Sequence, residues 1–274
     1  MPSQVTIPQL QQMKRNDHKI VGVVAWDVHI ARIADRIGVE ILSVGDSVGI
    51  NLWGHLDPFS VTMDQMVTVA SAVRAGTSRA LVSCDLPFDP LVNGVSATVK
   101  AGLRMVKEVG VDMVKLDGAA GCPEAVSALT EAGVPVWAQF GVTPHTASQY
   151  GIKYNDLSEA EVPSEMKNQL VSEAKLLEAA GAVLLDFTNS GPYVGPAVTT
   201  AVSIPVIGGF GGGPWLDGRV RMAHAAIGYG ERHIDEAIET YANVANITLQ
   251  AINAFADDVR AERQIKGATK TVVG

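Results

Sequence analysis

Short apolar segments alternate with helical segments along most of this sequence, and this alternation restricts the fold more than any other feature. The apolar segments are short and rich in Val, Ile, Leu and Ala, which is typical of strands buried on both faces. They lie at residues 19–26, 39–45, 79–84, 111–116, 134–140, 182–187 and 204–209. Helical patterns occupy residues 28–37, 63–75, 94–109, 123–132, 164–180 and 195–202. Strands and helices that alternate across short loops indicate parallel βαβ units.

Four of the predicted helices end in the same way. The segments "RIGVE", "EVGVD", "EAGVP" and "AAGAV" each place a glycine just after the helix and an apolar residue at the start of the next strand. Glycine is common at this position because it adopts the left-handed conformation without a Cβ clash. The repeated boundary therefore supports a regular series of βα units.

The number of βα units distinguishes a closed barrel from an open sheet. Seven strands are evident, and an eighth is weakly indicated within residues 216–224. Eight units close a TIM barrel, an α/β fold for which 274 residues is an ordinary length. Six or seven units would instead form an open, doubly wound sheet. The first βα turn, "AWDVHIAR", has no glycine-rich dinucleotide fingerprint, so we predict one (β/α)8 barrel domain over residues 1–274.

Residues 231–262 read as one long amphipathic helix after the barrel. Such a helix either covers the barrel or contacts a neighbouring subunit.

Composition and charge exclude several classes of protein. The net charge of −8, without a Lys/Arg-rich segment, argues against binding to nucleic acid or to an anionic membrane. No apolar stretch approaches the ~20 residues of a membrane span, and the N-terminus lacks the apolar core of a signal peptide. Two cysteines, Cys84 and Cys122, do not make a disulfide framework. We therefore expect a soluble cytoplasmic protein.

Polar side chains follow most of the predicted strands, where the chain leaves each strand. In a TIM barrel these strand ends meet at one face, which carries the active site. Carboxylates gathered there repel one another, and a cation relieves that repulsion. Mg²⁺ prefers oxygen ligands, usually one or two carboxylates with waters and substrate oxygens. The strand-end residues are Asp27, Asp46, Ser47, Asp85, Lys115, Asp117, Gln139 and Asp186.

Each of these residues also has a purely structural interpretation. Asp27, Asp46 and Asp85 precede predicted helices and are suitable N-caps. Asp117 precedes a glycine and suits a turn. Lys115 is either a satisfied charge inside the barrel or the group that holds an anionic substrate. The sequence alone leaves these alternatives open.

Four further residues are weaker candidates. His55 is either a hydrogen-bonding loop residue or a substrate contact. Gly209 belongs to "GGFGGG", residues 208–213, which either binds phosphate through backbone N–H groups or forms a flexible turn. His145 is expected to cap or open a helix. Cys122 begins a helix, where the pKa of its thiol would be lowered, but no His is obviously paired with it.

Several motifs, taken in order, resemble one known family. They are "AWD", "ILSVGDSVG", "VTMDQM", "RALVSCDLPF", "VDMVKLDG", "GVPVWAQFGVTP" and "IPVIGGFGGGPWLDGRV". From about residue 19 to about residue 225, the sequence is similar to the ketopantoate hydroxymethyltransferase (3-methyl-2-oxobutanoate hydroxymethyltransferase) family, which belongs to the phosphoenolpyruvate mutase/isocitrate lyase superfamily.

This resemblance implies a TIM barrel that binds Mg²⁺ and transfers a hydroxymethyl group to a small-molecule 2-oxo acid, with 5,10-methylenetetrahydrofolate as the one-carbon donor. It implies that Asp46 and Asp85 hold the metal, with Asp117 nearby or acting through water. Ser47 and Lys115 would contact the carboxylate and keto oxygen of the substrate. It also implies a homo-oligomer.

The sequence departs from the family pattern at three positions in the predicted site. The family usually has Glu where this chain has Asp117, and Glu at the acid/base position occupied by Asp186. It usually has His where Gln139 stands as a substrate-binding residue, and Gln cannot exchange a proton as His does. These departures leave open a paralogue that acts on another 2-oxo acid or electrophile, or a C–C lyase or decarboxylase. A non-catalytic binding or assembly protein is a further alternative.

Overall fold

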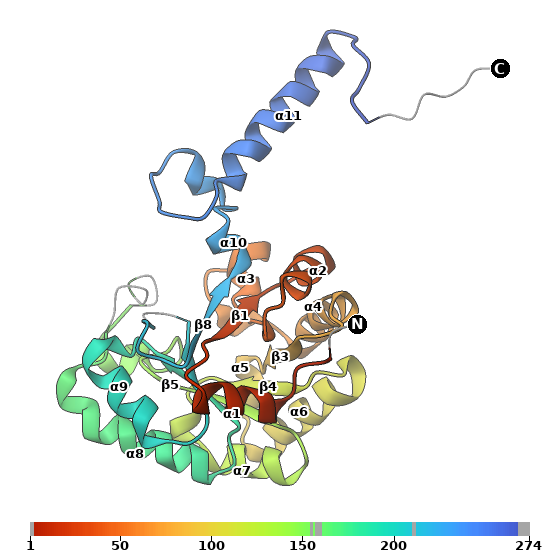
Figure 1. Ribbon diagram of the computed structural model, residues 1–274. Coiled ribbons are helices and arrows are strands. Elements are labelled where there is room, and N and C mark those ends of the chain that lie inside the picture. The colour runs from red at the N-terminus through yellow and green to blue at the C-terminus, as the bar shows by residue number, and fades with distance from the viewer. Residues whose placement is uncertain (1–2, 154–155, 157–160, 210–211, 268–274) are drawn as a thin grey trace. The chain divides into compact units, whose positions relative to one another are not determined.

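A computed structural model describes residues 3–153, 156, 161–209 and 212–267. The chain divides into two compact units, Met1–Arg221 and Met222–Gly274. Within the described residues, parallel strands form a closed barrel in the order β1 to β8 (Figure 1). These strands are β1 Ile20–Val24, β2 Ile41–Val44, β3 Leu81–Asp85, β4 Met113–Leu116, β5 Val136–Gly141, β6 Leu184–Thr188, β7 Val206–Gly208 and β8 Gly218–Met222. The prediction of a TIM barrel is confirmed.

Helices connect the strands and surround the barrel in Figure 1. They are α1 Ile7–Arg15, α2 Val28–Ile37, α3 Val48–Trp53, α4 Met63–Gly76, α5 Phe88–Val92, α6 Val95–Val109, α7 Pro123–Glu131, α8 Lys167–Ala179 and α9 Gly191–Ala201. The helices α10 Ala223–Ala226 and α11 Val244–Arg260 belong to the second unit. Short 3₁₀ helices are η1 Pro58–Ser60, η2 Ala119–Gly121, η3 Ala147–Tyr150, η5 Ser164–Met166 and η6 Glu231–Ile234. The glycines predicted to follow four helices, Gly38, Gly110, Gly133 and Gly181, all have positive φ.

The eighth strand is weak in the sequence because its residues alternate instead of forming an apolar run. Gly218 and Val220 are buried in β8, whereas the arginines beside them are exposed. β8 pairs with β7, and the amide of Ile20 donates to the carbonyl of Asp217 at 2.9 Å. These contacts close the barrel between its last strand and its first.

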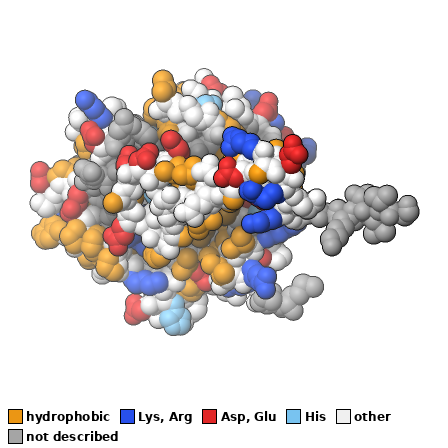
Figure 2. Space-filling model, turned by 90° about the horizontal axis from the view of Figure 1, so that it is seen from above, with side chains coloured by type: hydrophobic (Ala, Val, Ile, Leu, Met, Phe, Trp, Pro, Cys, Tyr) orange, Lys and Arg blue, Asp and Glu red, His pale blue; other side chains and the backbone are white. Residues whose placement is uncertain are grey.

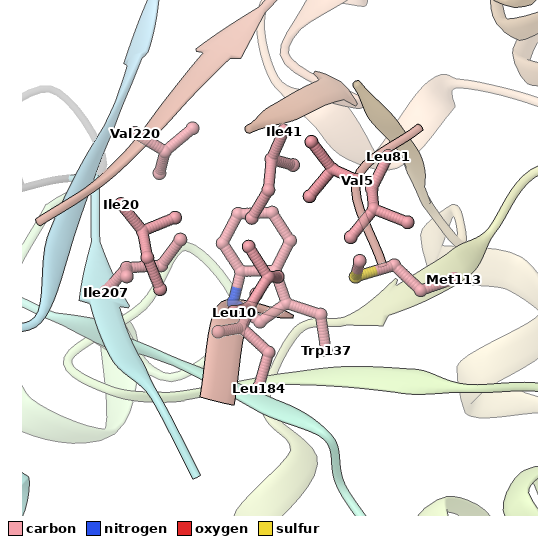
Figure 3. Close-up of a cluster of buried hydrophobic side chains, with 10 residues drawn as sticks. All are labelled: Val5, Leu10, Ile20, Ile41, Leu81, Met113, Trp137, Leu184, Ile207 and Val220. Atoms are coloured by element: carbon pink, nitrogen blue, oxygen red, sulfur yellow. The ribbon is translucent and has the colours of Figure 1, made fainter. Parts of the chain in front are cut away.

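An apolar layer fills the N-terminal end of the barrel. Leu10 from α1 and Val5 point into a ring of inward-facing side chains, with Trp137 near the centre (Figure 3). α1 begins with a capping box, in which Thr6 and Gln9 satisfy each other's backbone amides. The ring consists of Ile20, Ile41, Leu81, Met113, Trp137, Leu184, Ile207 and Val220. This end is therefore a packed floor closed by α1.

Carboxylates around this floor accept hydrogen bonds from the backbone amides at or near the strand starts. Asp35, for example, accepts from Ala80 at 2.8 Å, just before β3. The other pairs are Glu40 with Val21, Asp112 with Val82, Asp217 with Val206 and Glu178 with Ile204. A cavity of about 400 Å³ lies at the same end, and its charged residues, Arg79 and Glu40, are already hydrogen-bonded to the backbone.

The second unit contains α10, η6 and α11. The prediction of one helix over residues 231–262 is wrong, because α11 begins only at Val244. Asn243 caps α11, because its side-chain oxygen accepts a hydrogen bond from the backbone amide of Asn246 at 3.0 Å. Its side-chain Nδ2 donates to the carbonyl of His233 at 2.8 Å. The amide of Val244 also bonds back to Ile227. These hydrogen bonds hold Asn243 in a non-helical conformation, so the helix does not continue toward η6. That α11 covers the barrel or contacts another subunit stays a prediction.

The surface combines charges of both signs. On the face shown in Figure 2, acidic and basic side chains are interspersed with hydrophobic ones. Among the described residues, no helix combines the length and apolar character needed to cross a membrane.

Candidate active site

The strand register brings the predicted site residues together at the C-terminal end of the barrel. Asp85 is the last residue of β3 and pairs in register with Lys115 of β4. Gln139 of β5 pairs in register with Asp186 of β6. Asp46 directly follows the glycine after β2. Side chains that are far apart in the sequence therefore share one barrel mouth.

Lys115 and Asp186 form an ion pair within this mouth. Lys115 Nζ lies 2.8 Å from Asp186 Oδ2, and the two side chains are 12% and 3% exposed. The backbone amide of Gly209 donates to Asp186 Oδ1 at 3.4 Å. Lys115 Nζ also lies 5.1 Å from the ring centroid of Trp137. Burial would lower the pKa of Lys115, but the carboxylates of Asp186 and Asp85 outweigh it and raise that pKa. The ammonium therefore stays charged.

Asp46 and Asp85 lie against each other across β2 and β3. The backbone amide of Asp46 donates to Asp85 Oδ2 at 3.3 Å. Burial, and then the carboxylates of Asp85 and Asp117, raise the pKa of Asp46 well above its ordinary value. Burial also raises the pKa of Asp85, against the attraction of Lys115. The site thus concentrates negative charge that the protein alone does not neutralise.

The donor atoms of this cluster suit a divalent cation. Asp85 Oδ1 and Asp117 Oδ1 are buried and have no hydrogen-bond partner among the described residues. Unsatisfied buried carboxylate oxygens are costly unless another group binds them. The described residues contain no group of three or more His, Cys, Asp or Glu side chains placed to hold a metal. Mg²⁺ does not require such a group, because waters and substrate oxygens complete its coordination.

Gly45 explains the glycine in the segment "VGDS". A Cβ atom at this position would lie 2.9 Å from Ser47 Oγ and 3.7 Å from Asp85 Oδ2. The absence of a side chain at Gly45 leaves room for both Ser47 and Asp85. Ser47 precedes α3, but its hydroxyl makes no capping hydrogen bond there. Its side chain is therefore not used by the helix.

Gln139 makes a specific contact at the base of the mouth. Its Nε2 atom donates to Thr188 Oγ1 of β6 at 3.1 Å, and its side chain is buried. The amide is thereby held in one orientation beside Asp186.

The prediction that a strand-end aspartate caps the next helix is confirmed for Asp27 but wrong for Asp46 and Asp85. Asp27 is an N-cap, because its Oδ1 accepts from His29 and Ile30 at 2.8 and 2.9 Å. Asp46 and Asp85 are not the N-caps of α3 and α5. His55 packs beside Trp53, with ring centroids 5.8 Å apart. Its Nδ1 atom is buried without a hydrogen-bond partner in the described part of the chain.

The remaining weaker candidates are also placed. Gly209 contacts Asp186 as described, but residues 210–211 of the glycine-rich segment lie outside the described residues. Asp117 precedes Gly118, whose φ of 66° fits the predicted turn. The prediction that the pKa of the Cys122 thiol is lowered is wrong. Burial, and then the negative charges of Glu124 and Asp117, raise that pKa.

The sequence predicts only that His145 caps or opens a helix, but the N-cap of η3 is Thr146, and His145 lies in the mouth. Its Nε2 atom lies 3.8 Å from Asp117 Oδ2. Its ring packs against Phe59 and Phe88, with centroid separations of 5.5 and 5.2 Å. The only signal in the sequence is a polar residue four positions after β5, in "VTPH".

Comparison with known proteins gives consistent results over nearly the whole chain. The family model described as "Ketopantoate hydroxymethyltransferase" matches residues 4–264. A relative from Cyanothece sp. (strain PCC 7425 / ATCC 29141), named "3-methyl-2-oxobutanoate hydroxymethyltransferase", is 37% identical over 262 residues, covering 94% of this chain and 97% of that protein. A relative of the same name from Moorella thermoacetica (strain ATCC 39073 / JCM 9320) is 36% identical over 259 residues, covering 94% of each.

Solved structures share the fold at low sequence identity. A 2,3-dimethylmalate lyase, described as a PEP mutase/isocitrate lyase superfamily member, has a TM-score of 0.61 at 11% identity, covering 99% of this chain and 92% of that one. A putative phosphonomutase from Burkholderia cenocepacia J2315 has a TM-score of 0.60 at 14% identity, covering 94% of this chain and 100% of that one. At these identities the likeness concerns the fold alone.

Proposed function

The chain belongs to the ketopantoate hydroxymethyltransferase family, and we propose on this basis that it is a Mg²⁺-dependent enzyme that enolises a 2-oxo acid and adds a hydroxymethyl group to it. The proposed substrate is 3-methyl-2-oxobutanoate, and the proposed one-carbon donor is 5,10-methylenetetrahydrofolate. A cytoplasmic location and a homo-oligomeric state are part of the same proposal.

One observation carries the proposal. The Lys115–Asp186 ion pair lies at the same mouth as Asp46, Asp85 and Asp117, whose charges act on it. A cation-binding acidic cluster beside a fixed ammonium and a separate carboxylate provides every group that enolisation of a 2-oxo acid requires.

Asp46 and Asp85 are the residues that would hold Mg²⁺, with Asp117 nearby or acting through water. Bound there, Mg²⁺ supplies positive charge that stabilises the oxygen on which negative charge develops during enolisation. Ser47 adds a hydroxyl, not used to cap α3, that can donate to the substrate carboxylate. Lys115 binds the same anionic end of the substrate and orients it.

Asp186 is the proposed base that takes the C3 proton. Without substrate, Asp186 and Lys115 neutralise each other at 2.8 Å. A 2-oxo acid that attracts the ammonium toward its own oxygens leaves Asp186 Oδ2 available for the proton. The amide of Gly209 keeps hold of Oδ1, so the carboxylate remains oriented during this exchange.

Gln139 favours a second candidate within the same chemistry. Its amide is bonded to Thr188 and cannot relay a proton. Asp186 is also one methylene shorter than the Glu usual in the family. Both features would suit a different 2-oxo acid or a different electrophile, while the acidic cluster and Lys115 keep their roles. The relatives described above are named as hydroxymethyltransferases, which favours catalysis over an assembly role.

Hydrogen–deuterium exchange tests the proposal directly. Proton NMR in D₂O with Mg²⁺ should show loss of the C3 proton signal of 3-methyl-2-oxobutanoate, or of another acid in a panel of 2-oxo acids. Asp186→Asn should slow that exchange by at least about 100-fold and still bind Mg²⁺ and oxalate, as measured by calorimetry. If no 2-oxo acid exchanges its C3 proton with the wild-type protein, enolisation is the wrong chemistry.

A further inference from the structure

His145 and Asp117 form a side-chain pair at the edge of the acidic cluster. His145 follows β5 and Asp117 follows β4, so the two residues come from loops of neighbouring strands. Their side chains are only 9% and 11% exposed, and Nε2 lies 3.8 Å from Oδ2. Asp117 acts electrostatically on Asp46, Asp85 and Lys115. The pair therefore lies within reach of the groups that the proposed function uses.

The imidazole ring of His145 is fixed by its surroundings. Phe88 meets it edge-on at an interplanar angle of 81°, and Phe59 packs on it at 46°. The backbone beside it is braced, because Thr143 and Thr146 exchange hydrogen bonds between side chains and backbone amides. Gly118 passes close by, since a Cβ there would lie 3.7 Å from His145 Cβ. A ring held on these sides keeps one orientation.

Both members of the pair have unsatisfied buried atoms. His145 Nε2 and Asp117 Oδ1 have no hydrogen-bond partner among the described residues. A buried polar atom without a partner destabilises the fold, because it has lost its hydrogen bonds to water. A separation of 3.8 Å is too long for a hydrogen bond, but a small closure or one bridging water would satisfy Nε2.

We propose that His145 is a positioning residue for Asp117: its Nε2–H donates to Oδ2, directly or through one water, and leaves Oδ1 for a divalent cation. This inference rests on the Mg²⁺-dependent function proposed above. It assigns His145 a role through Asp117, without contact with substrate. Outer partners that orient a carboxylate ligand contribute about 10- to 100-fold in metal affinity.

Two substitutions separate the hydrogen bond from the packing. His145→Phe keeps an aromatic ring between Phe59 and Phe88 but removes the donor, whereas His145→Gln keeps a donor and loses the ring. Isothermal calorimetry of the whole chain with Mg²⁺ alone gives the readout, and thermal unfolding checks the fold. His29→Ala, an exposed histidine at the start of α2, is the matched control.

The expected result is a loss of about 10- to 100-fold in Mg²⁺ affinity for His145→Phe. The affinity of His145→Gln should stay within about threefold of the wild type, because its side-chain N–H can still donate. On an Asp117→Asn background, His145→Phe should have no additional effect, since coupled residues are not additive. If His145→Phe does not fold, His145→Leu allows the same comparison.

The outcomes distinguish this inference from the function on which it rests. Unchanged Mg²⁺ affinity in His145→Phe, with normal binding in the wild type, overturns the positioning role and leaves the proposed function intact. Equal losses in His145→Phe and His145→Gln mean that the geometry of the ring, not its donor, matters, and also overturn it. Absence of Mg²⁺ binding in the wild type overturns both.

Discussion

Carboxylates lie at both ends of the barrel, but their oxygens have different partners. At the N-terminal end, Asp35 accepts hydrogen bonds from Ser78, Arg79 and Ala80. At the C-terminal end, Asp85 and Asp117 each have a buried oxygen without a partner in the described part of the chain. The protein's own amides satisfy the carboxylate of Asp35, whereas Asp85 and Asp117 each keep one oxygen that no described group satisfies.

The charge of each carboxylate reflects this difference. Partial burial would raise the pKa of Asp35, but hydrogen bonds from residues 78–80 lower it overall. Burial and neighbouring carboxylates raise the pKa of Asp46 instead. Ionisation therefore stabilises the fold at the N-terminal end and destabilises the ligand-free protein at the C-terminal end. The charge of Asp35 therefore contributes to stability, whereas the charge of Asp46 is suited to binding a ligand.

The largest expected effect is on binding at the C-terminal end. Asp85→Asn should lower Mg²⁺ affinity by more than about 100-fold and slow C3 proton exchange by about 1,000-fold. Its free energy of unfolding should stay the same or increase, because a buried charge beside Asp46 is removed. Calorimetry, NMR exchange and urea unfolding measure the three quantities. Asp89→Asn, at an exposed carboxylate in the first turn of α5, is the control. A clear loss of stability in Asp85→Asn would contradict the comparison.

In the apolar floor at the N-terminal end, a substitution should lower stability and leave the proton-exchange rate nearly unchanged. Leu184→Ala removes a fully buried side chain from the apolar layer and should lower the free energy of unfolding by about 2–5 kcal/mol. The proton-exchange rate of the remaining folded protein should be nearly unchanged. Leu176→Ala, at an exposed position on α8, should change stability by less than about 0.5 kcal/mol. A site that fails while Leu184→Ala stays folded would mean that the two ends are not separable.

The smallest expected effect concerns a single satisfied carboxylate and depends on pH. Asp35→Asn should lower the free energy of unfolding by about 1–3 kcal/mol at pH 7. The pKa of Asp35 is lower in the folded state than in the unfolded state. The ionised side chain therefore adds to the free energy of unfolding above the unfolded pKa of about 4. That added stability is lost as the pH falls through the folded pKa. The difference from wild type should therefore shrink in acid.

Urea unfolding at several pH values measures this dependence. Asp64→Asn, an 84% exposed carboxylate paired with Arg104, should cost less than about 1 kcal/mol. A deficit of Asp35→Asn that stays constant down to pH 3 would show that its hydrogen bonds do not depend on the charge.

The regular part of the fold was predictable because it is encoded locally. The strands of the barrel, the glycines that end four helices and the bounds of α4 all follow from short segments. α1, α3 and α5 were missed because they are short, and α1 is mostly polar with only Leu10 buried. The start of α11 was also missed, since Asn243 and its backbone bonds depend on residues ten or more positions away.

The site was predictable in composition but not in contacts. Strand-end carboxylates and Lys115 stand out in the sequence because charges are rare within buried strands. The partners of these residues depend on barrel closure, which sets the register between strands. The contact of Gln139 with Thr188 and the approach of His145 to Asp117 join residues 28 or more positions apart. No local pattern reports such pairs.

Trp137 belongs to both ends of the barrel at once. Its indole is part of the apolar floor, and its ring face lies beneath the ammonium of Lys115. Lys115 Nζ lies 5.1 Å from the centroid of this ring and is held from another side by Asp186. A substitution that moves the Trp137 ring itself would therefore also move the ammonium above it, whereas one that leaves the ring in place would not.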